Sequence, residues 1–271
     1  MNEIRERRRL SFGSVAEQYD RARPTYPERL VEDVVAYAAD GLAAAPRALE
    51  VGAGTGKATL QFAARGLAID AVEPDGAMAA VASLRAATAS VDVRTQVSDF
   101  ESAEIPERSY GLLYSGQAWH WVTPERRYEL AGRALAPAGA LAVFWNRPDW
   151  TRCELRDALE GAYRRSGVAM VSRGPLHPRG HEPLLEEGDS WFDELAASPE
   201  FTGAELRRYD WVRRYAATEY VDLVGTHSDH LLLDADQRDR LFAEITDAID
   251  AAGGSFEFPY GTLLCLARRL P

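Results

Sequence analysis

The chain has 271 residues, 46% of them hydrophobic, which is enough for one large α/β domain or a domain with an insertion. Its formal net charge of −11 argues against a nucleic acid or an anionic membrane surface as a partner, since both need basic residues to meet phosphates. No apolar run reaches the roughly 18 residues of a transmembrane helix. Cys153 and Cys265 give neither a disulfide framework nor zinc spacing, and the charged N-terminus lacks a signal peptide's apolar core, so a reducing cytoplasm is expected.

Strand-like and helix-like runs alternate from Ala48 to Asn146, which predicts a parallel sheet with crossover helices. Thr123 is expected to cap one of these helices through its hydroxyl, with Pro124 in the first turn. The predicted strands lie near 47–52, 68–73, 91–97, 110–115 and 138–146, and the helices near 56–65, 76–86, 124–135 and 151–166.

The pattern breaks down from about 167 to 200, where Gly174-Pro175 and His177-Pro178 predict irregular structure. A loop of this length inside a compact domain is usually functional. Further on, Asp234 and Gln237 resemble a capping box at the start of a long helix. The remaining distal elements are predicted as a strand at 205–215, a short helix at 218–224, this long helix to about 252, and a final strand at 262–267.

A glycine-rich turn joins the first strand of this pattern to the helix that follows. Gly52, Gly54 and Gly56 let the backbone turn tightly and approach a ligand closely. The N–H groups at the start of the next helix point into the same space. The turn therefore predicts a site for a nucleotide-like ligand.

Spacing alone does not identify that ligand. The dinucleotide fingerprint needs a glycine at position 57, where Lys57 stands. The P-loop needs a glycine at Val51 and a hydroxyl at Ala58. Because each pattern fails at two or fewer positions, both remain open on spacing.

Two carboxylates favour a cationic ligand that carries a ribose. Glu50, two residues before the first glycine, would repel a pyrophosphate and could attract the amino group or sulfonium of a methyl donor. Glu73 ends the next strand, where an acid can accept hydrogen bonds from both ribose hydroxyls.

The segments from Glu50 to Gly56 and from Val72 to Asp75 resemble the first two motifs of the class I, Rossmann-like S-adenosylmethionine-dependent methyltransferases. This resemblance implies that Glu50 and the glycines face the methionine half of the cofactor and that Glu73 holds its ribose. Arg23 could pair with the methionine carboxylate, although ordinary surface packing stays open for Arg23 and Tyr19. The full cofactor-binding set comprises Tyr19, Arg23, Glu50, Gly52, Ala53, Gly54, Gly56, Glu73, Pro74, Met78, Asp99, Phe100, Ser115 and Gln117, with Asp99 and Phe100 at the adenine.

The fold expected from this resemblance is α/β, with a mostly parallel seven-stranded Rossmann-like sheet, helices on both faces and an antiparallel last strand. The resemblance also implies a helical cap, which is formed by the N-terminus and by an insertion after the fifth strand. The chain forms a single methyltransferase domain over 1–271. Its parts are a helical cap (1–40), a cofactor-binding core (45–166), an irregular substrate-cap insertion (167–203) and the C-terminal part of the sheet with helices (204–271).

The loop after the fourth strand, from Ser115 to Trp121, places His120 between two tryptophans. This loop, the segment from Phe12 to Pro27 and Thr226-His227-Ser228 resemble small-molecule methyltransferases of the trans-aconitate and ubiquinone/menaquinone-biosynthesis type. Aromatic faces can stabilise a sulfonium by cation–π contact, which makes Tyr19 a further candidate wall. The predicted substrate residues are Tyr26, Trp119, Trp121 and His227.

His120 is the candidate catalytic base, because an imidazole can accept a proton from a hydroxyl near neutral pH. Two alternatives stay open: His120 orders the loop or bonds the adenine end, and a carboxylate acceptor needs no base. No metal site is expected, since Pro178 and Gly180 disrupt the spacing of His177 and His181. Trp191-Phe192 is expected to cover the cleft, and Lys57 is expected on the surface.

The sequence thus predicts an enzyme that transfers a methyl group from S-adenosylmethionine to a small, partly apolar or aromatic molecule, most readily to oxygen. Transfer to nitrogen or carbon, and a non-catalytic cofactor-binding protein, are the alternatives; Lys57 disfavours a nicotinamide oxidoreductase. Lys57 is the only lysine, an arginine bias typical of a GC-rich bacterial genome, and natural-product tailoring is the expected setting. A homodimer stays open.

Overall fold

The computed structural model describes residues 16–168, 190–227 and 230–271. Within them, one sheet of seven strands has the order β3-β2-β1-β4-β5-β7-β6. Strands β1 to β5 are mutually parallel where they pair, and β7 runs antiparallel to both neighbours, as the sequence predicted. The strands are β1 (Arg47–Val51), β2 (Ala68–Glu73), β3 (Val93–Val97), β4 (Tyr110–Gly116), β5 (Leu135–Pro148), β6 (Phe201–Ala216) and β7 (Ser255–Arg269).

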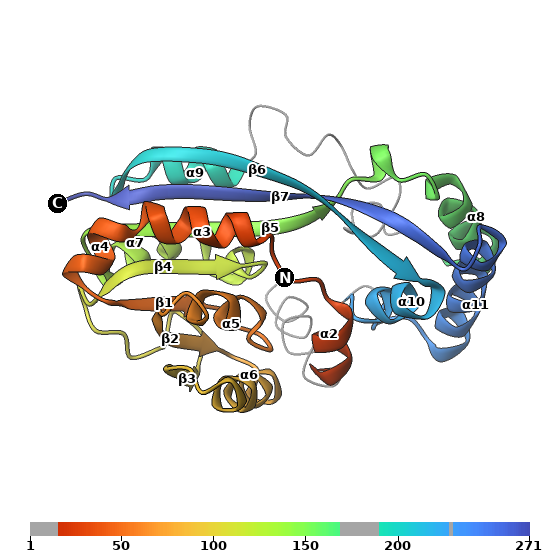
Figure 1. Cartoon of the computed structure of the whole chain (residues 1–271), viewed down its shortest axis with the longest axis horizontal. Helices are drawn as coiled ribbons and strands as arrows, with labels where there is room; N and C mark the ends of the chain where they lie inside the picture. The colour runs from red at the N-terminus through yellow and green to blue at the C-terminus, as the bar shows by residue number, and fades with distance from the viewer. Residues whose placement is uncertain (1–15, 169–189, 228–229) are drawn as a thin grey trace.

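Helices connect most of the first five strands, although no helix lies between β3 and β4, and further helices follow β5 (Figure 1). Two short 3-10 turns, η2 (Trp119–Trp121) and η3 (Trp150–Arg152), follow β4 and β5. None of the helices in the described part of the chain is long and apolar enough to cross a membrane. The helices are α2 (Ala16–Ala22), α3 (Glu28–Tyr37), α4 (Ala39–Ala44), α5 (Lys57–Ala63), α6 (Gly76–Ala89), α7 (Pro124–Ala134), α8 (Arg156–Ser166), α9 (Ser190–Ala197), α10 (Ala217–Gly225) and α11 (Ala235–Ala251).

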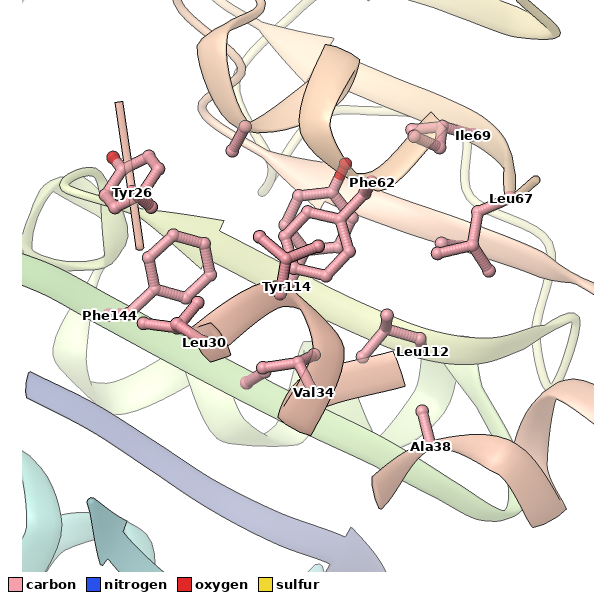
Figure 2. Close-up of a cluster of buried hydrophobic side chains, with 14 of the residues drawn as sticks. Tyr26, Leu30, Val34, Ala38, Phe62, Leu67, Ile69, Leu112, Tyr114 and Phe144 are labelled. Atoms are coloured by element: carbon pink, nitrogen blue, oxygen red, sulfur yellow. The ribbon is translucent and has the colours of Figure 1, made fainter. Parts of the chain in front are cut away.

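One face of the sheet is covered by α3 and α5. Leu30 and Val34 of α3, one helical turn apart, are fully buried against it. Phe62 of α5 stacks on Tyr114 of β4 with ring centroids 4.1 Å apart, as Figure 2 shows for this cluster. Apolar burial of this kind holds the first turn of α5, and hence the glycine turn, against the strand ends.

The opposite face is covered by α7 and α9. Tyr128 of α7 and Leu195 of α9 pack in one buried cluster with Leu113 and Leu141 of the sheet. Strands β6 and β7 then run on past the end of β5 and carry a third cluster with α8, α10 and α11, built around Tyr215 and other aromatic side chains. This helical lobe lies at one end of the molecule (Figure 1).

Some expectations are corrected by long-range contacts. Pro124 does begin α7, but the Thr123 hydroxyl donates to Glu101 at 2.7 Å and makes no capping bond. Residues 190–197 form α9, so this part of the predicted irregular insertion is helical, and 169–189 lie outside the described residues. Asp234 caps α11 as predicted, because its side chain accepts the N–H of Gln237 at 2.8 Å.

Candidate functional site

A pocket opens beside the glycine turn, at the carboxyl ends of β1 and β4. Its volume is about 470 Å³, including space open to solvent. Residues from four parts of the chain meet there: the N-terminal cap, the end of β1 with its turn, the start of α5 and the end of β4. They are Tyr19, Arg23, Pro24, Tyr26, Glu50, Gly52, Ala53, Gly54, Thr55, Lys57, Ala58, Gly116 and Gln117.

The glycines of the turn are required by their conformation. Gly52 and Gly54 have φ values of 74° and 57°, in the left-handed region that side chains rarely adopt. A Cβ at Gly52 would lie 2.3 Å from the Cβ of Ala118, so any larger residue there would push the β4 loop away. A Cβ at Gly54 would meet only the terminal methyl of Met78, at 3.9 Å, within the described residues.

Glu73 ties this turn to the end of β2. One carboxylate oxygen accepts the N–H of Gly54 at 2.8 Å, and the other accepts the N–H of Asp75 at 2.9 Å. Asp75 in turn caps α6 by accepting the N–H groups of Ala77 and Met78. The predicted ribose carboxylate is therefore buried and held in place by the backbone on both sides.

Glu50 is almost completely buried at the end of β1. The hydroxyls of Thr59 and Tyr114 both donate to the same carboxylate oxygen, the latter at 3.0 Å. Burial nevertheless dominates and raises the pKa of Glu50 to about 8, with the nearby Glu73 charge adding to the rise. A cation bound in the pocket would favour the ionised form of this carboxylate.

Thr55, in the middle of the turn, is a pocket residue that sequence reasoning missed. Its hydroxyl is buried and has no hydrogen-bond partner among the described residues. A buried polar atom without a partner costs about 1–3 kcal/mol, so a polar ligand group in this pocket would relieve that cost. Its place between Gly54 and Gly56 was the available signal.

Helix α2 contributes Tyr19 to the pocket lining and is held by contacts to α5, α6 and α10. The Lys57 ammonium donates to the carbonyl of Asp20 and lies 3.7 Å from its carboxylate, which also binds Arg85. Lys57 is only 14% exposed, which corrects its prediction as a surface residue. Gln18 reaches Asp222 of α10 at 3.3 Å.

Arg23 lines the pocket but is already engaged by the helical lobe. Its Nε donates to the Thr226 hydroxyl at 2.8 Å, and one Nη donates to the Thr226 carbonyl at 3.1 Å. The predicted bidentate pairing with a carboxylate through these two nitrogens is therefore not available in this structure. The guanidinium lies over the ring of Tyr19, with 5.0 Å between its carbon and the ring centroid.

The end of β4 forms another wall. The Ser115 hydroxyl donates to the carbonyl of Val51 at 2.8 Å and so joins β4 to β1, away from the pocket lining. Gln117 has a φ of 62° and donates to the Asn146 carbonyl at 3.2 Å. A Cβ at Gly116 would lie 2.6 Å from the hydroxyl oxygen of Tyr26, so this glycine makes room for the aromatic wall.

The residues predicted at the adenine lie at the ends of β2 and β3. The Ser98 N–H bonds the Glu73 carbonyl, which places Asp99 beside that carboxylate-bearing strand end. Asp99 also accepts the N–H of Ser102 at 2.9 Å. Phe100 is buried, as is Met78, whereas Pro74 is half-buried. Gly56 directly precedes α5. Half of the predicted cofactor residues line the pocket, namely Tyr19, Arg23, Glu50, Gly52, Ala53, Gly54 and Gln117, whereas the other predicted residues lie outside its lining.

The residues of the loop from Ser115 to Trp121 differ in their burial. Trp119 is fully buried against Phe100 and Tyr128, so it is a core residue and not the exposed wall that was expected. Trp121 and His120 are half-buried, with their ring centroids 4.8 Å apart. His120 also lies 6.4 Å from Trp191 of α9 and outside the lining of the glycine-turn pocket.

His227 follows α10 and is buried inside the helical lobe. Its Nε2 has no hydrogen-bond partner in the part of the chain that the structure describes. Burial lowers its pKa well below the usual value, and the charges of Arg23 and His230 lower it further, so the imidazole is neutral at pH 7. The neighbouring His230 is bound by Tyr163 at 2.8 Å.

The aromatic cover predicted from Trp191-Phe192 lies on α9. Trp191 packs on Trp145 with centroids 5.3 Å apart, and the Arg127 guanidinium lies 4.4 Å from its ring centroid. Both residues are part of the cluster under α7 and α9, which corrects their placement over the cofactor cleft. Among the described residues no group of three or more His, Cys, Asp or Glu side chains could hold a metal ion; His177 and His181 lie outside them.

Comparison with known proteins connects this geometry to a family. Residues 49–143 match a family model described as a methyltransferase domain. A Mycobacterium tuberculosis protein named an uncharacterized methyltransferase is 31% identical over 219 residues, covering 81% of this chain and 77% of the relative. A fission yeast protein with a similar name is 25% identical over 243 residues, with 88% and 87% covered.

Solved structures show the same fold. A candidate type II methyltransferase from Anaeromyxobacter dehalogenans superposes with a TM-score of 0.61 at 22% identity, covering 92% of this chain and 99% of that one. The YcgJ protein of Bacillus subtilis has a TM-score of 0.51 at 19% identity, covering 87% and 99%. The chain therefore shares its overall fold with these proteins.

Proposed function

Because this chain belongs to the class I S-adenosylmethionine-dependent methyltransferases, we propose that it methylates an oxygen atom of a small, partly apolar or aromatic molecule. The observation that carries this proposal is the aromatic lobe beside the pocket. It encloses an imidazole nitrogen, Nε2 of His227, that has no partner among the residues described. A neutral imidazole among aromatic rings suits a molecule with an apolar body and a polar hydroxyl.

The pocket fits the cofactor on grounds internal to the protein. The orphaned Thr55 hydroxyl, the buried Glu50 carboxyl and the open space above Gly54 all face one volume or border it. We infer that Glu50 holds the ammonium group and that Glu73 receives the ribose hydroxyls beside its backbone contacts. Asp99 and Phe100 would border the adenine, and Tyr19 with Tyr26 would exclude water from the reacting centre.

When bound, S-adenosylmethionine supplies a methyl carbon on a positively charged sulfur. The main task of the protein is then alignment, because the donor is already activated. In the proposed step the acceptor's O–H bond breaks and its proton passes to the His120 imidazole. The oxygen would then take up the methyl group that the bound cofactor supplies, and the sulfur would keep the electron pair of the broken carbon–sulfur bond. His227 Nε2 would accept a hydrogen bond from the acceptor and orient it.

The test follows the label in a methyl group. The full chain is incubated with S-adenosylmethionine carrying a ¹³C methyl and with separate panels of phenols, aliphatic alcohols, carboxylic acids and amines. Carbon NMR of the products distinguishes methyl on oxygen, nitrogen and carbon. The proposal expects O-methyl products from the phenols or alcohols; products methylated only on nitrogen or carbon, or cofactor binding without any turnover, would contradict it.

Bacterial natural-product tailoring and a cytoplasmic location complete the proposed setting. The arginine-rich composition supports a bacterial origin, and the aromatic lobe suits an aromatic acceptor of this kind. The cytoplasmic location is supported by the presence of only two cysteines, Cys153 and Cys265, which are both free in the structure. A chain of net charge −11 is a poor partner for nucleic acids, in keeping with a small-molecule acceptor.

A further inference from the structure

Strand β6 forms one edge of the sheet and is unusually long. It has 16 residues and, within the part of the chain that the structure describes, pairs with β7 alone. Only Phe201 and Tyr215 of this strand are buried, whereas most of β7 is buried. Figure 1 shows β6 as the outermost strand of the sheet. An edge of this length presents a row of backbone N–H and C=O groups on which another strand can pair.

The charged side chains of β6 include both signs, and two of the arginines pair with acids of the same strand. Arg207 donates to Glu205, and Arg208 donates to Asp210 at 2.7 Å. Charges on an edge strand can simply protect it from unwanted pairing. If a second copy of β6 pairs with this edge, the register of the pair decides which of these charges lie opposite each other.

A symmetric dimer restricts the possible registers. A two-fold axis perpendicular to the sheet makes two copies of β6 antiparallel and keeps each side chain on its own face. The axis must then pass between the two strands at the level of one residue, which lies opposite its own copy. With the axis at Tyr209, Glu205 lies opposite the partner's Arg213, and Arg208 lies opposite the partner's Asp210. Each opposite-charge contact occurs twice by symmetry.

The same register also matches the apolar side chains. Leu206 lies opposite the partner's Val212, which is 46% exposed in the single chain. Arg207 lies opposite the partner's Trp211, a favourable arrangement of a guanidinium and an aromatic ring. Burial of Val212 by a second copy would remove one of the largest exposed apolar side chains of the described residues.

Neighbouring registers place like charges together. With the axis at Arg208, this arginine lies opposite the partner's Arg208. With the axis at Asp210, this aspartate lies opposite the partner's Asp210, and Arg207 lies opposite the partner's Arg213. Like charges directly opposite each other destabilise an antiparallel pair. The register centred on Tyr209 is therefore favoured over those on either side.

We propose that β6 is a dimerisation edge, on which the β6 strand of a second copy pairs antiparallel in the register centred on Tyr209. The sheet then continues through the dimer. This inference rests on the position and charge order of β6 and is independent of the proposed methyl acceptor.

Sedimentation equilibrium of the full chain across micromolar concentrations tests this pairing with complementary variants. Asp210→Arg places two positive side chains opposite each other in the proposed register, and Arg208→Asp places two negative ones there. Each variant alone should weaken dimerisation more than tenfold. An equimolar mixture of the two should restore the dimer, since every contact in the mixed pair again joins opposite charges. Glu129→Arg, an exposed change on α7, should leave dimerisation unaltered.

Circular dichroism confirms that each variant is folded before sedimentation. Should either fail to fold, Glu205→Arg and Arg213→Glu form a second complementary pair on the other face of the same register. A monomeric wild-type chain, single variants that still dimerise, or a mixture of folded variants that stays monomeric would each overturn the proposal.

Discussion

The carboxylate of Glu73 accepts the backbone N–H of Gly54 at 2.8 Å, so the ends of β1 and β2 are joined at the glycine turn. This contact fixes a turn in the left-handed conformation to a strand end that carries an acid. A second acid, Glu50, lies nearby, where burial and, to a smaller extent, the Glu73 charge raise its pKa to about 8. The pocket therefore combines a rigid backbone with a carboxyl group that is protonated in the absence of a ligand.

Replacement of Glu50 by Gln is expected to flatten the pH dependence of stability. Burial raises the folded-state pKa of Glu50 to about 8 from a usual value of 4.5, so the folded chain binds this proton more tightly than the unfolded chain. The stabilisation is full below pH 4.5 and is lost as pH rises towards 8, at about 1.4 kcal/mol per pH unit. Urea unfolding of wild type and Glu50→Gln between pH 5 and 9 measures it. If the free energy of unfolding changed with pH in the same way for both chains, the raised pKa of Glu50 would be contradicted.

Cofactor binding is expected to release a proton through the same residue. A cation placed beside Glu50 lowers its pKa, so the carboxyl ionises as the ligand enters near neutral pH. Calorimetry in buffers of different ionisation enthalpy counts the protons released per S-adenosylmethionine bound. The wild type should release a substantial fraction of one proton, and Glu50→Gln should release less. An identical proton count for both chains would exclude this role.

Lys57→Met is expected to loosen α2 over the pocket. The ammonium group holds Asp20 of α2, and hydrogen bonds to charged groups contribute about 1.5–3 kcal/mol. Dissociation of S-adenosylmethionine, followed by stopped-flow fluorescence, should be at least about fivefold faster. Arg94→Met, an exposed change on β3, serves as the matched control. Equal dissociation rates for Lys57→Met and wild type would show that this contact does not retain the ligand.

His120→Ala is expected to lower the methyl-transfer rate more than about tenfold while leaving cofactor affinity little changed. The imidazole is half-buried between Trp121 and Trp191 and outside the glycine-turn lining, so its loss should leave the cofactor contacts intact. Single-turnover kinetics and calorimetry separate the two quantities. A rate equal to that of the wild type would remove His120 from the proposed mechanism.

Local sequence signals were sufficient for the cofactor half of the fold. The β1 strand, the glycine turn and α5 follow one another within a short segment, and the requirement for positive φ at Gly52 and Gly54 is a property of the backbone. Glu73 could be predicted because the end of β2 lies beside the end of β1 in any parallel pair. These inferences needed only the order of elements and the geometry of parallel strands.

The residues whose surroundings differ from the prediction contact residues that are distant in the sequence. Arg23 bonds Thr226, which lies 203 positions away. Lys57 is covered by α2, and the Thr123 hydroxyl is taken by Glu101 across a loop. Trp119 is buried through the packing of α7 against the sheet. No periodicity or motif encodes such partners, because the helical lobe and the N-terminal cap are placed by the folded sheet.

The most direct test of the account is a calorimetric titration of the full chain with S-adenosylmethionine and, separately, with NAD. The wild type should bind S-adenosylmethionine at one site per chain and should not bind NAD. Glu73→Ala removes the acceptor of the Gly54 and Asp75 N–H groups and should weaken S-adenosylmethionine binding more than about tenfold. The exposed variant Glu104→Gln should bind as the wild type does. Undiminished binding by folded Glu73→Ala, or binding of NAD without S-adenosylmethionine, would contradict the central claim.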